Sequence, residues 1–166
     1  MKKGAILGFA LTLAVSGALA LAESASAKVC DNDATTSSGC TQKYGGTWTH
    51  EDSSKSYNSD HRISKSGATN SDWYEWRFPT LPSGKTTLEV YLADSSFTNR
   101  EADYEVLSWV WDYDEYVGSV NQYSAPSGWN TVGSIRLDAA KASVTVYGKD
   151  HSGASSTRTG ADAASL

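Results

Sequence analysis

The stretch Trp73–Leu92 restricts the fold more than any other part of the chain. Residues 74–78 alternate aromatic with charged side chains, and residues 88–92 alternate aliphatic side chains with Glu and Tyr. A period of two is typical of half-buried strands. The connecting segment Pro79–Gly84 holds two prolines and a glycine, which favour a tight turn, so we expect a β-hairpin. Because an isolated hairpin is marginal in water, we expect it at the centre of an antiparallel β-sandwich.

Residues 1–27 have the three-part pattern of a secretory signal peptide. Two lysines precede an apolar run over residues 5–22, and small residues follow, with Ala25 and Ala27 at the positions that a signal peptidase reads. A membrane anchor is the alternative, since the run is almost long enough to span a bilayer. The small-residue end and the lack of a flanking basic stop favour a cleaved leader. We therefore expect a secreted, extracellular protein consisting of residues 28–166.

This mature chain has 139 residues, enough for one domain with a single hydrophobic core. Without the two lysines and one glutamate of the leader, 12 basic and 18 acidic residues remain, a net charge of −6. An acidic exported chain is a poor partner for nucleic acid or anionic lipid. We expect no nucleic-acid partner and, after cleavage of the leader, no membrane partner.

Both cysteines of the chain, Cys30 and Cys40, lie in the mature part. An even number of cysteines in an exported chain predicts one disulfide, which here closes a short loop near the N-terminus. A zinc site is the weaker alternative, because no second pair of Cys or His stands at ligand spacing. Residues 31–46 are rich in Asp, Ser, Thr and Gly, so we expect an ordered loop held by the disulfide.

The rest of the chain predicts further short strands and no long helix. Candidate strands cover residues 47–50, 61–65, 102–111, 115–121, 129–137, 143–147 and 161–166. Within 102–111 the alternation changes phase by one residue, which predicts a β-bulge; a short helix over residues 100–109 is the alternative. About nine short strands at this spacing predict an all-β sandwich.

A set of short motifs also occurs in order along the mature chain. They are Asp31-Asn32, Gly46-Thr-Trp-Thr49, Tyr57, Ser59-Asp60-His-Arg62, Trp76-x-Phe-Pro79, Leu81-Pro-Ser-Gly84, Leu88-Glu-Val-Tyr91, Asn121-Gln122, Gly128-Trp-Asn130, Gly133 and Ala161-Asp-Ala163. Together they resemble the golvesin / xanthan lyase carbohydrate-binding-like domain family. The resemblance implies a jelly-roll-type β-sandwich and a non-catalytic accessory domain of polysaccharide-active or cell-surface proteins. The cysteine pair and the aromatic, acidic segment 109–116 depart from the pattern.

Aromatic side chains carry the main functional signal, because flat rings suit the apolar C–H faces of sugars. Three tryptophans, Trp48, Trp76 and Trp129, are expected in the core, given their place in the alternation or in the family motifs. Trp73 is out of phase with its aromatic neighbours, and we expect it to face outward. Trp109 and Trp111 share one face, either as part of the core or as an exposed platform.

Acidic and polar residues next to these tryptophans could bind sugar hydroxyls. The expected ligand-binding residues are Trp73, Trp109, Trp111, Asp112, Tyr113 and Asp114. We expect no cofactor and no metal. Calcium is the alternative for the acidic segment 112–115 and for Asp31-Asn-Asp33, and a solvated or capped turn is the favoured interpretation of each.

No catalytic motif is present, and we expect no enzymatic activity. The three histidines lack paired spacing, Gly-x-Ser-x-Gly is absent, and acidic pairs suited to glycosidic cleavage cannot be identified by spacing alone. The sequence therefore predicts a secreted non-catalytic binding module for a polysaccharide or cell-wall glycan. The alternative is a secreted protein-interaction module (an adhesin, inhibitor or structural component) that uses the same aromatic-acidic surface, because Trp and Tyr are also favoured at protein interfaces.

Overall fold

The computed structural model describes residues 27–33, 39–93, 96–108, 113–138 and 140–166, without the side chains of Tyr113 and Ala140. In this part of the chain the fold is all-β, and the single helical element is the 3₁₀ turn η1 (Tyr57–Ser59). No helix of these residues is long and apolar enough to cross a bilayer.

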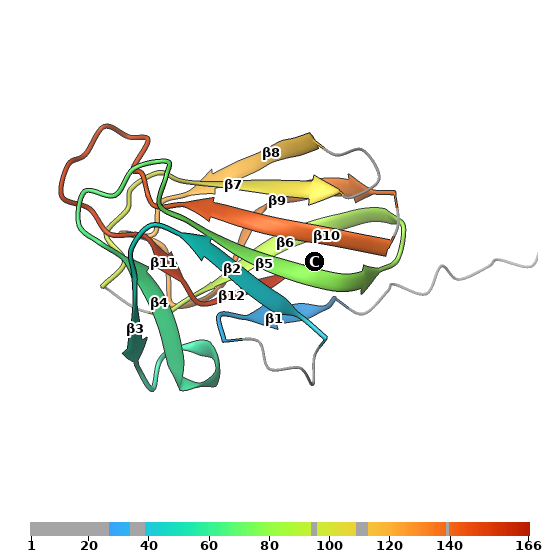
Figure 1. Cartoon of the computed structure of the whole chain (residues 1–166), viewed down its shortest axis with the longest axis horizontal. Coiled ribbons are helices and arrows are strands. Elements are labelled where there is room, and N and C mark those ends of the chain that lie inside the picture. Colours follow the sequence, from blue (N-terminus) through green and yellow to red (C-terminus); the bar gives the residue numbers. More distant parts are fainter. Residues whose placement is uncertain (1–26, 34–38, 94–95, 109–112, 139) are drawn as a thin grey trace, which may run out of the picture.

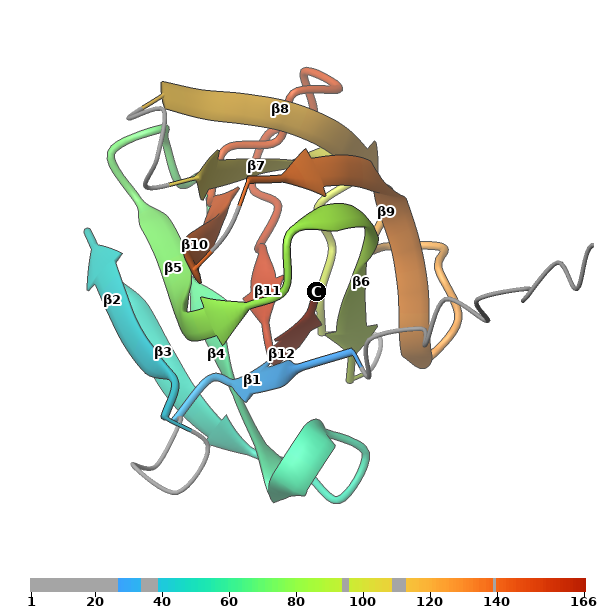
Figure 2. The same cartoon turned by 90° about the vertical axis from the view of Figure 1, so that its right-hand side faces the viewer.

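The described residues form twelve strands in three antiparallel sheets (Figures 1 and 2). The four-stranded sheet has the order β1 (Val29–Asp31), β12 (Ala163–Ser165), β6 (Gly84–Leu92) and β9 (Gly128–Leu137). The five-stranded sheet has the order β2 (Thr41–Gly45), β5 (Trp73–Leu81), β10 (Ala140–Tyr147), β7 (Ala102–Ser108) and β8 (Tyr113–Val120). A three-stranded sheet adds β11 (Gly160–Ala161), β4 (Asp60–Ser64) and β3 (Trp48–Asp52). The predicted antiparallel β-sandwich is confirmed.

The two strands that the sequence analysis paired as a hairpin do not pair. β5 belongs to the five-stranded sheet and β6 to the four-stranded sheet, so the connection through Pro82 carries the chain from one layer to the other. Figure 2 shows the two strands on opposite sides of the sandwich. Both strands alternate because each turns one face toward the same core. Pro79 lies inside β5, at an irregularity in the pairing with β10, where a missing N–H is tolerated.

The core lies between the two larger sheets. Its largest fully buried side chains include Tyr74, Trp76 and Phe78 of β5, which face Leu88 and Val90 of β6. Trp48 and Trp76 are buried, as the sequence analysis expected.

The two larger sheets meet along β8 and β9, where both strands carry a bulge. Each bulge brings a glycine against the backbone of the other strand. A Cβ atom on Gly118 would lie 2.7 Å from the Val132 carbonyl oxygen, and one on Gly133 would lie 2.6 Å from the Val117 carbonyl oxygen. Only glycine permits this approach, and it closes one side of the sandwich (Figure 2).

The N-terminal region contains more regular structure than the loop predicted for residues 31–46. Cys30, inside β1, and Cys40, directly before β2, form the predicted disulfide. Residues 102–108 are a strand, so the alternative helix is wrong there. The bulge in this pair lies in β8, opposite Tyr104 and Glu105, and not at the predicted position in β7; residues 109–111 are outside the described part of the chain.

Candidate functional site

A shallow hollow lies on the outer face of the five-stranded sheet, on the side away from the core. It crosses four adjacent strands. Its lining residues are Trp73 and Glu75 of β5, Ser143, Thr145 and Tyr147 of β10, Leu107 of β7 and Asp114 of β8. Register explains this grouping, because Trp73 is paired with Tyr147, and Ser143 is paired with Leu107, which in turn is paired with Asp114. Directly paired residues of neighbouring strands turn to the same face of a sheet.

The indole of Trp73 covers the backbone of the edge strand β2. Its partner across the pair is Gly45, and a Cβ atom built there would lie 2.5 Å from Trp73 Nε1 and 2.8 Å from Cε2. The absence of a side chain at position 45 therefore leaves the space that the indole occupies. Trp73 is half-buried and faces outward, so one part of its ring contacts the sheet and another part meets solvent.

Polar groups surround the aromatic side of the hollow. The Tyr147 hydroxyl donates a hydrogen bond to Glu105 Oε2 at 2.7 Å, and Arg77 Nε donates to Glu75 Oε2 at 2.9 Å. Burial and this contact with the Glu105 carboxylate raise the pKa of Tyr147 well above its usual value, so the phenol stays protonated. The Ser143 hydroxyl is buried and has no hydrogen-bond partner among the described residues. A buried hydroxyl without a partner is costly, and a ligand hydroxyl could satisfy it.

Asp72 stabilises the end of β5 that carries Trp73. Its carboxylate accepts hydrogen bonds from the Thr47 N–H at 3.1 Å and the Thr69 N–H at 2.9 Å, and lies 3.1 Å from Lys65 Nζ. Burial alone would raise the pKa of Asp72, but the two N–H groups and the ammonium outweigh it and hold this pKa below its ordinary value.

The hollow contains two of the six predicted ligand-binding residues, Trp73 and Asp114. Trp109, Trp111 and Asp112 lie outside the described residues, as does the side chain of Tyr113. The remaining lining residues of β5, β7 and β10 were not predicted as ligand-binding residues. The sequence gives only a partial indication of these residues. Ser143, Thr145 and Tyr147 form the polar side of the alternation in β10, but alternation alone does not distinguish a ligand-binding face from a solvent-exposed one.

A second aromatic cluster lies on the four-stranded sheet. Tyr91 of β6, Trp129 of β9 and Tyr57 of η1 contact one another with ring centroids 5.4–5.6 Å apart. The prediction that Trp129 lies in the core is wrong, because 38% of this residue is exposed. In a regular strand, Trp129 would face the same side as the buried residues near the end of β9. The bulge in β9 shifts the register by one residue between Thr131 and Gly133, so Trp129 turns outward instead.

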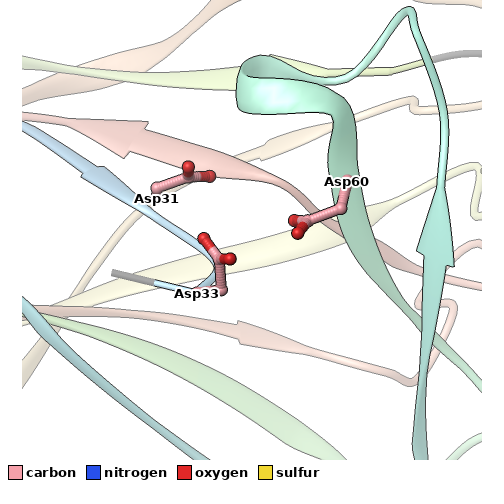
Figure 3. Close-up of side chains that lie close together, drawn as sticks. All are labelled: Asp31, Asp33 and Asp60. Carbon is pink, nitrogen blue, oxygen red and sulfur yellow. The ribbon is translucent and has the colours of Figure 1, made fainter. Parts of the chain in front are cut away.

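Three carboxylates meet near the start of the domain. Asp31 at the end of β1, Asp33 just beyond it and Asp60 at the start of β4 place one oxygen each within 4.8 Å of the others (Figure 3). Burial raises the pKa of Asp31 to about 6, although hydrogen bonds from the Asn58 amide and the Asn32 N–H lower it. The Asn32 N–H donates a hydrogen bond to Asp31 Oδ1 at 2.8 Å. This group consists of oxygen ligands, the type that hard cations prefer.

No protein-family model and no curated protein matches the chain, so membership of the golvesin family stays a prediction. Solved structures with a similar fold do match. One is a xanthan lyase from Paenibacillus, with a TM-score of 0.66 and 18% identity over 84% of this chain. An exo-beta-1,3-galactanase from Phanerochaete chrysosporium, determined with galactose, has a TM-score of 0.55 and 12% identity over 86% of this chain. The chain spans only 13% and 30% of the lengths of these two proteins, and the likeness shows the fold alone.

Proposed function

We propose that this domain is a secreted, non-catalytic module that binds a polysaccharide through the outer face of its five-stranded sheet. The observation that carries the proposal is the hollow in which Trp73 and Tyr147 stand beside hydroxyl and carboxylate groups. A sugar ring offers an apolar face to the indole and hydroxyls to the surrounding polar atoms. The similar solved structures named above support it, because a xanthan lyase and an exo-beta-1,3-galactanase are polysaccharide-active enzymes that contain this fold.

The charges of the hollow favour a neutral glycan. Glu75 and Asp114 line it, and Glu105 contacts the Tyr147 hydroxyl next to it. The Arg77 guanidinium is paired with Glu75, so it offsets a charge that is already present. A polymer of uronic acids or pyruvylated sugars would bring further negative charges toward these carboxylates, whereas neutral sugar hydroxyls can donate hydrogen bonds to them.

The test is a binding assay with purified protein on insoluble polysaccharides and cell-wall preparations, with affinity electrophoresis for soluble polymers. A neutral β-1,3-galactan and the acidic polymer xanthan form a useful pair, because the fold occurs in enzymes named for both. We expect retention by a neutral glycan and weaker binding of xanthan.

Two tryptophan variants locate the binding surface. Trp73→Ala removes the ring from the hollow and should weaken binding about tenfold, since a ring contact and its buried area together are worth roughly 1–2 kcal/mol. Trp129→Ala removes a partly exposed tryptophan from the other sheet and should leave binding unchanged. Both variants need circular dichroism spectra like that of the wild type. Binding lost only in Trp129→Ala would move the site to the second aromatic cluster, and no binding to any glycan would favour the protein-interaction alternative.

A further inference from the structure

The three carboxylates described above form a cluster whose geometry suits a cation. Asp31 ends β1, Asp33 lies just beyond it, and Asp60 reaches toward them from the start of β4 (Figure 3). Calcium binds oxygen at 2.3–2.6 Å, so two of its ligands can be separated by at most about 5 Å. The oxygens of the cluster lie within 4.8 Å of one another. One calcium ion could therefore contact all three without a large movement of the chain.

The cluster has little positive charge of its own. Among the described residues, no Lys or Arg nitrogen lies within 4 Å of these carboxylates, and the basic group at that distance is His50, whose Nε2 is 3.1 Å from Asp60 Oδ2. Three carboxylates at this separation repel one another unless they take up protons or a cation.

Asn32 provides a second, independent observation. This residue is fully buried, and its side-chain amide is directed at the cluster, since Nδ2 donates to Asp60 Oδ1 at 2.6 Å. The Oδ1 atom of the same amide is buried and has no hydrogen-bond partner among the residues that the structure describes. A buried carbonyl oxygen without a partner is unfavourable, and amide oxygens are common calcium ligands.

We propose that Asp31, Asn32, Asp33 and Asp60 bind a hard divalent cation, with calcium as the preferred ion. The ligands are carboxylate and amide oxygens from two segments. Zinc prefers nitrogen and sulfur ligands, and magnesium requires a near-ideal octahedron at shorter distances.

The bound ion would link the N-terminal strand β1 to the turn that precedes β4. Within this turn Asn58 has a positive φ of 54° and donates from Nδ2 to Asp31 Oδ2 at 2.6 Å, so the cluster already holds an unfavourable backbone conformation. None of these residues lines the hollow that contains Trp73, so the cation site and the proposed glycan site are tested separately.

Isothermal titration calorimetry of the EDTA-treated, buffer-exchanged protein with CaCl₂, MgCl₂ and ZnCl₂ tests the proposal, with thermal melts in parallel. We expect one calcium ion per chain, weaker binding of magnesium, and a melting temperature that rises by several degrees with calcium, because only the folded chain assembles the ligands. Asp33→Asn should weaken calcium binding at least about tenfold. Glu115→Gln is the matched control: it removes the same charge from an exposed position of β8 in the five-stranded sheet, outside the cluster, and should change the affinity less than twofold.

Three results would overturn the proposal. The first is the absence of calcium binding by the wild-type protein up to about 10 mM, which is above the affinity range of extracellular calcium modules. The second is an equal loss of affinity in Asp33→Asn and Glu115→Gln, which would indicate general charge attraction. The third is tighter binding of zinc than of calcium. Because the wild-type titration decides the first and third results, a variant that fails to fold leaves the proposal testable.

Discussion

Gly45→Ala provides a direct test of how the hollow is built. Gly45 lies on β2 opposite Trp73, and its φ lies outside the left-handed region, so alanine fits the backbone. The new Cβ would lie 2.5 Å from Trp73 Nε1 and 2.8 Å from Cε2. Non-bonded carbon atoms prefer a separation of about 3.5–4.0 Å. The indole must therefore move away from the sheet by roughly 1 Å.

The energetic cost of this movement depends on how freely the indole can tilt. Overpacking a closed core costs about 1–3 kcal/mol. Trp73 is half-buried and can move toward solvent, so we expect the lower end, a loss of about 1 kcal/mol in the free energy of unfolding. Displacing a stacking ring by about 1 Å should remove a similar amount of binding energy, which corresponds to roughly fivefold weaker glycan binding.

Urea unfolding and affinity electrophoresis on the glycan that the wild-type protein retains measure the two effects. Thr87→Ala, at an exposed position of β6 on the other sheet, serves as the control and should change neither value. Unchanged glycan affinity in Gly45→Ala, together with an altered near-ultraviolet spectrum of the displaced indole, would refute the role of Trp73. A loss of stability above about 3 kcal/mol would show that the indole is a fixed part of the core.

Three further predictions concern the stability of the fold. Gly160→Ala should destabilise the protein by at least about 1–3 kcal/mol in urea unfolding, because its Cβ would overlap the buried ring of Phe97; wild-type stability in this variant would contradict the packing described. Asp72→Asn should lower the free energy of unfolding by about 2 kcal/mol at pH 7. The folded-state pKa of Asp72 is held below the ordinary aspartate value of about 3.9, so its stabilising contribution is present above that pH and is lost as the pH falls through the folded-state pKa. The difference in stability between wild type and variant should therefore shrink as the pH is lowered below about 4; a constant difference would contradict this contribution. Replacing Cys30 and Cys40 with serine should cost ~2.5–3 kcal/mol by the chain-entropy relation for a loop of this length, and an unchanged urea midpoint would contradict that value.

The sequence predicted well which segments form strands, and poorly which strands pair with one another. Alternation within β5 and β6 correctly identified the aromatic and aliphatic side chains that are buried, although Glu75, in the opposite phase of β5, is buried as well. It could not reveal that the two strands face each other across the core, because alternation reports the side of a strand that is buried and not the strand that lies beside it. Because the connection through Pro82 is short, pairing of β5 with β6 was the simplest expectation. Whether such a connection joins two paired strands or carries the chain to the opposite sheet depends on the packing of the whole domain.

Bulges limited the prediction of individual tryptophans. Trp76 lies in a regular part of β5, where parity predicts burial correctly, whereas Trp129 lies beyond a bulge that reverses the parity of β9. The bulge depends on contacts between Gly133 and Val117 of another strand, which one segment of sequence does not contain. The outward orientation of Trp73 was predicted, but its neighbours in the hollow come from strands distant in sequence and required the sheet order.

The acidic cluster shows the same limit. Asp31 and Asp33 were recognised together because only Asn32 separates them in the sequence. Asp60 joins them only after the folding of β4 beside the N-terminal segment. Nothing in the sequence indicates that the Asn32 side chain is buried with an unsatisfied oxygen.

The central claim is that glycan binds the face that carries Trp73. The most direct measurement is a ¹H–¹⁵N NMR titration that follows the indole N–H resonances, assigned by Trp73→Ala and Trp129→Ala, while an oligosaccharide of the retained glycan is added. We predict that the Trp73 indole resonance shifts with saturation and that the Trp129 resonance does not move. A shift of Trp129 with Trp73 unchanged would place the glycan on the other sheet and would contradict the account.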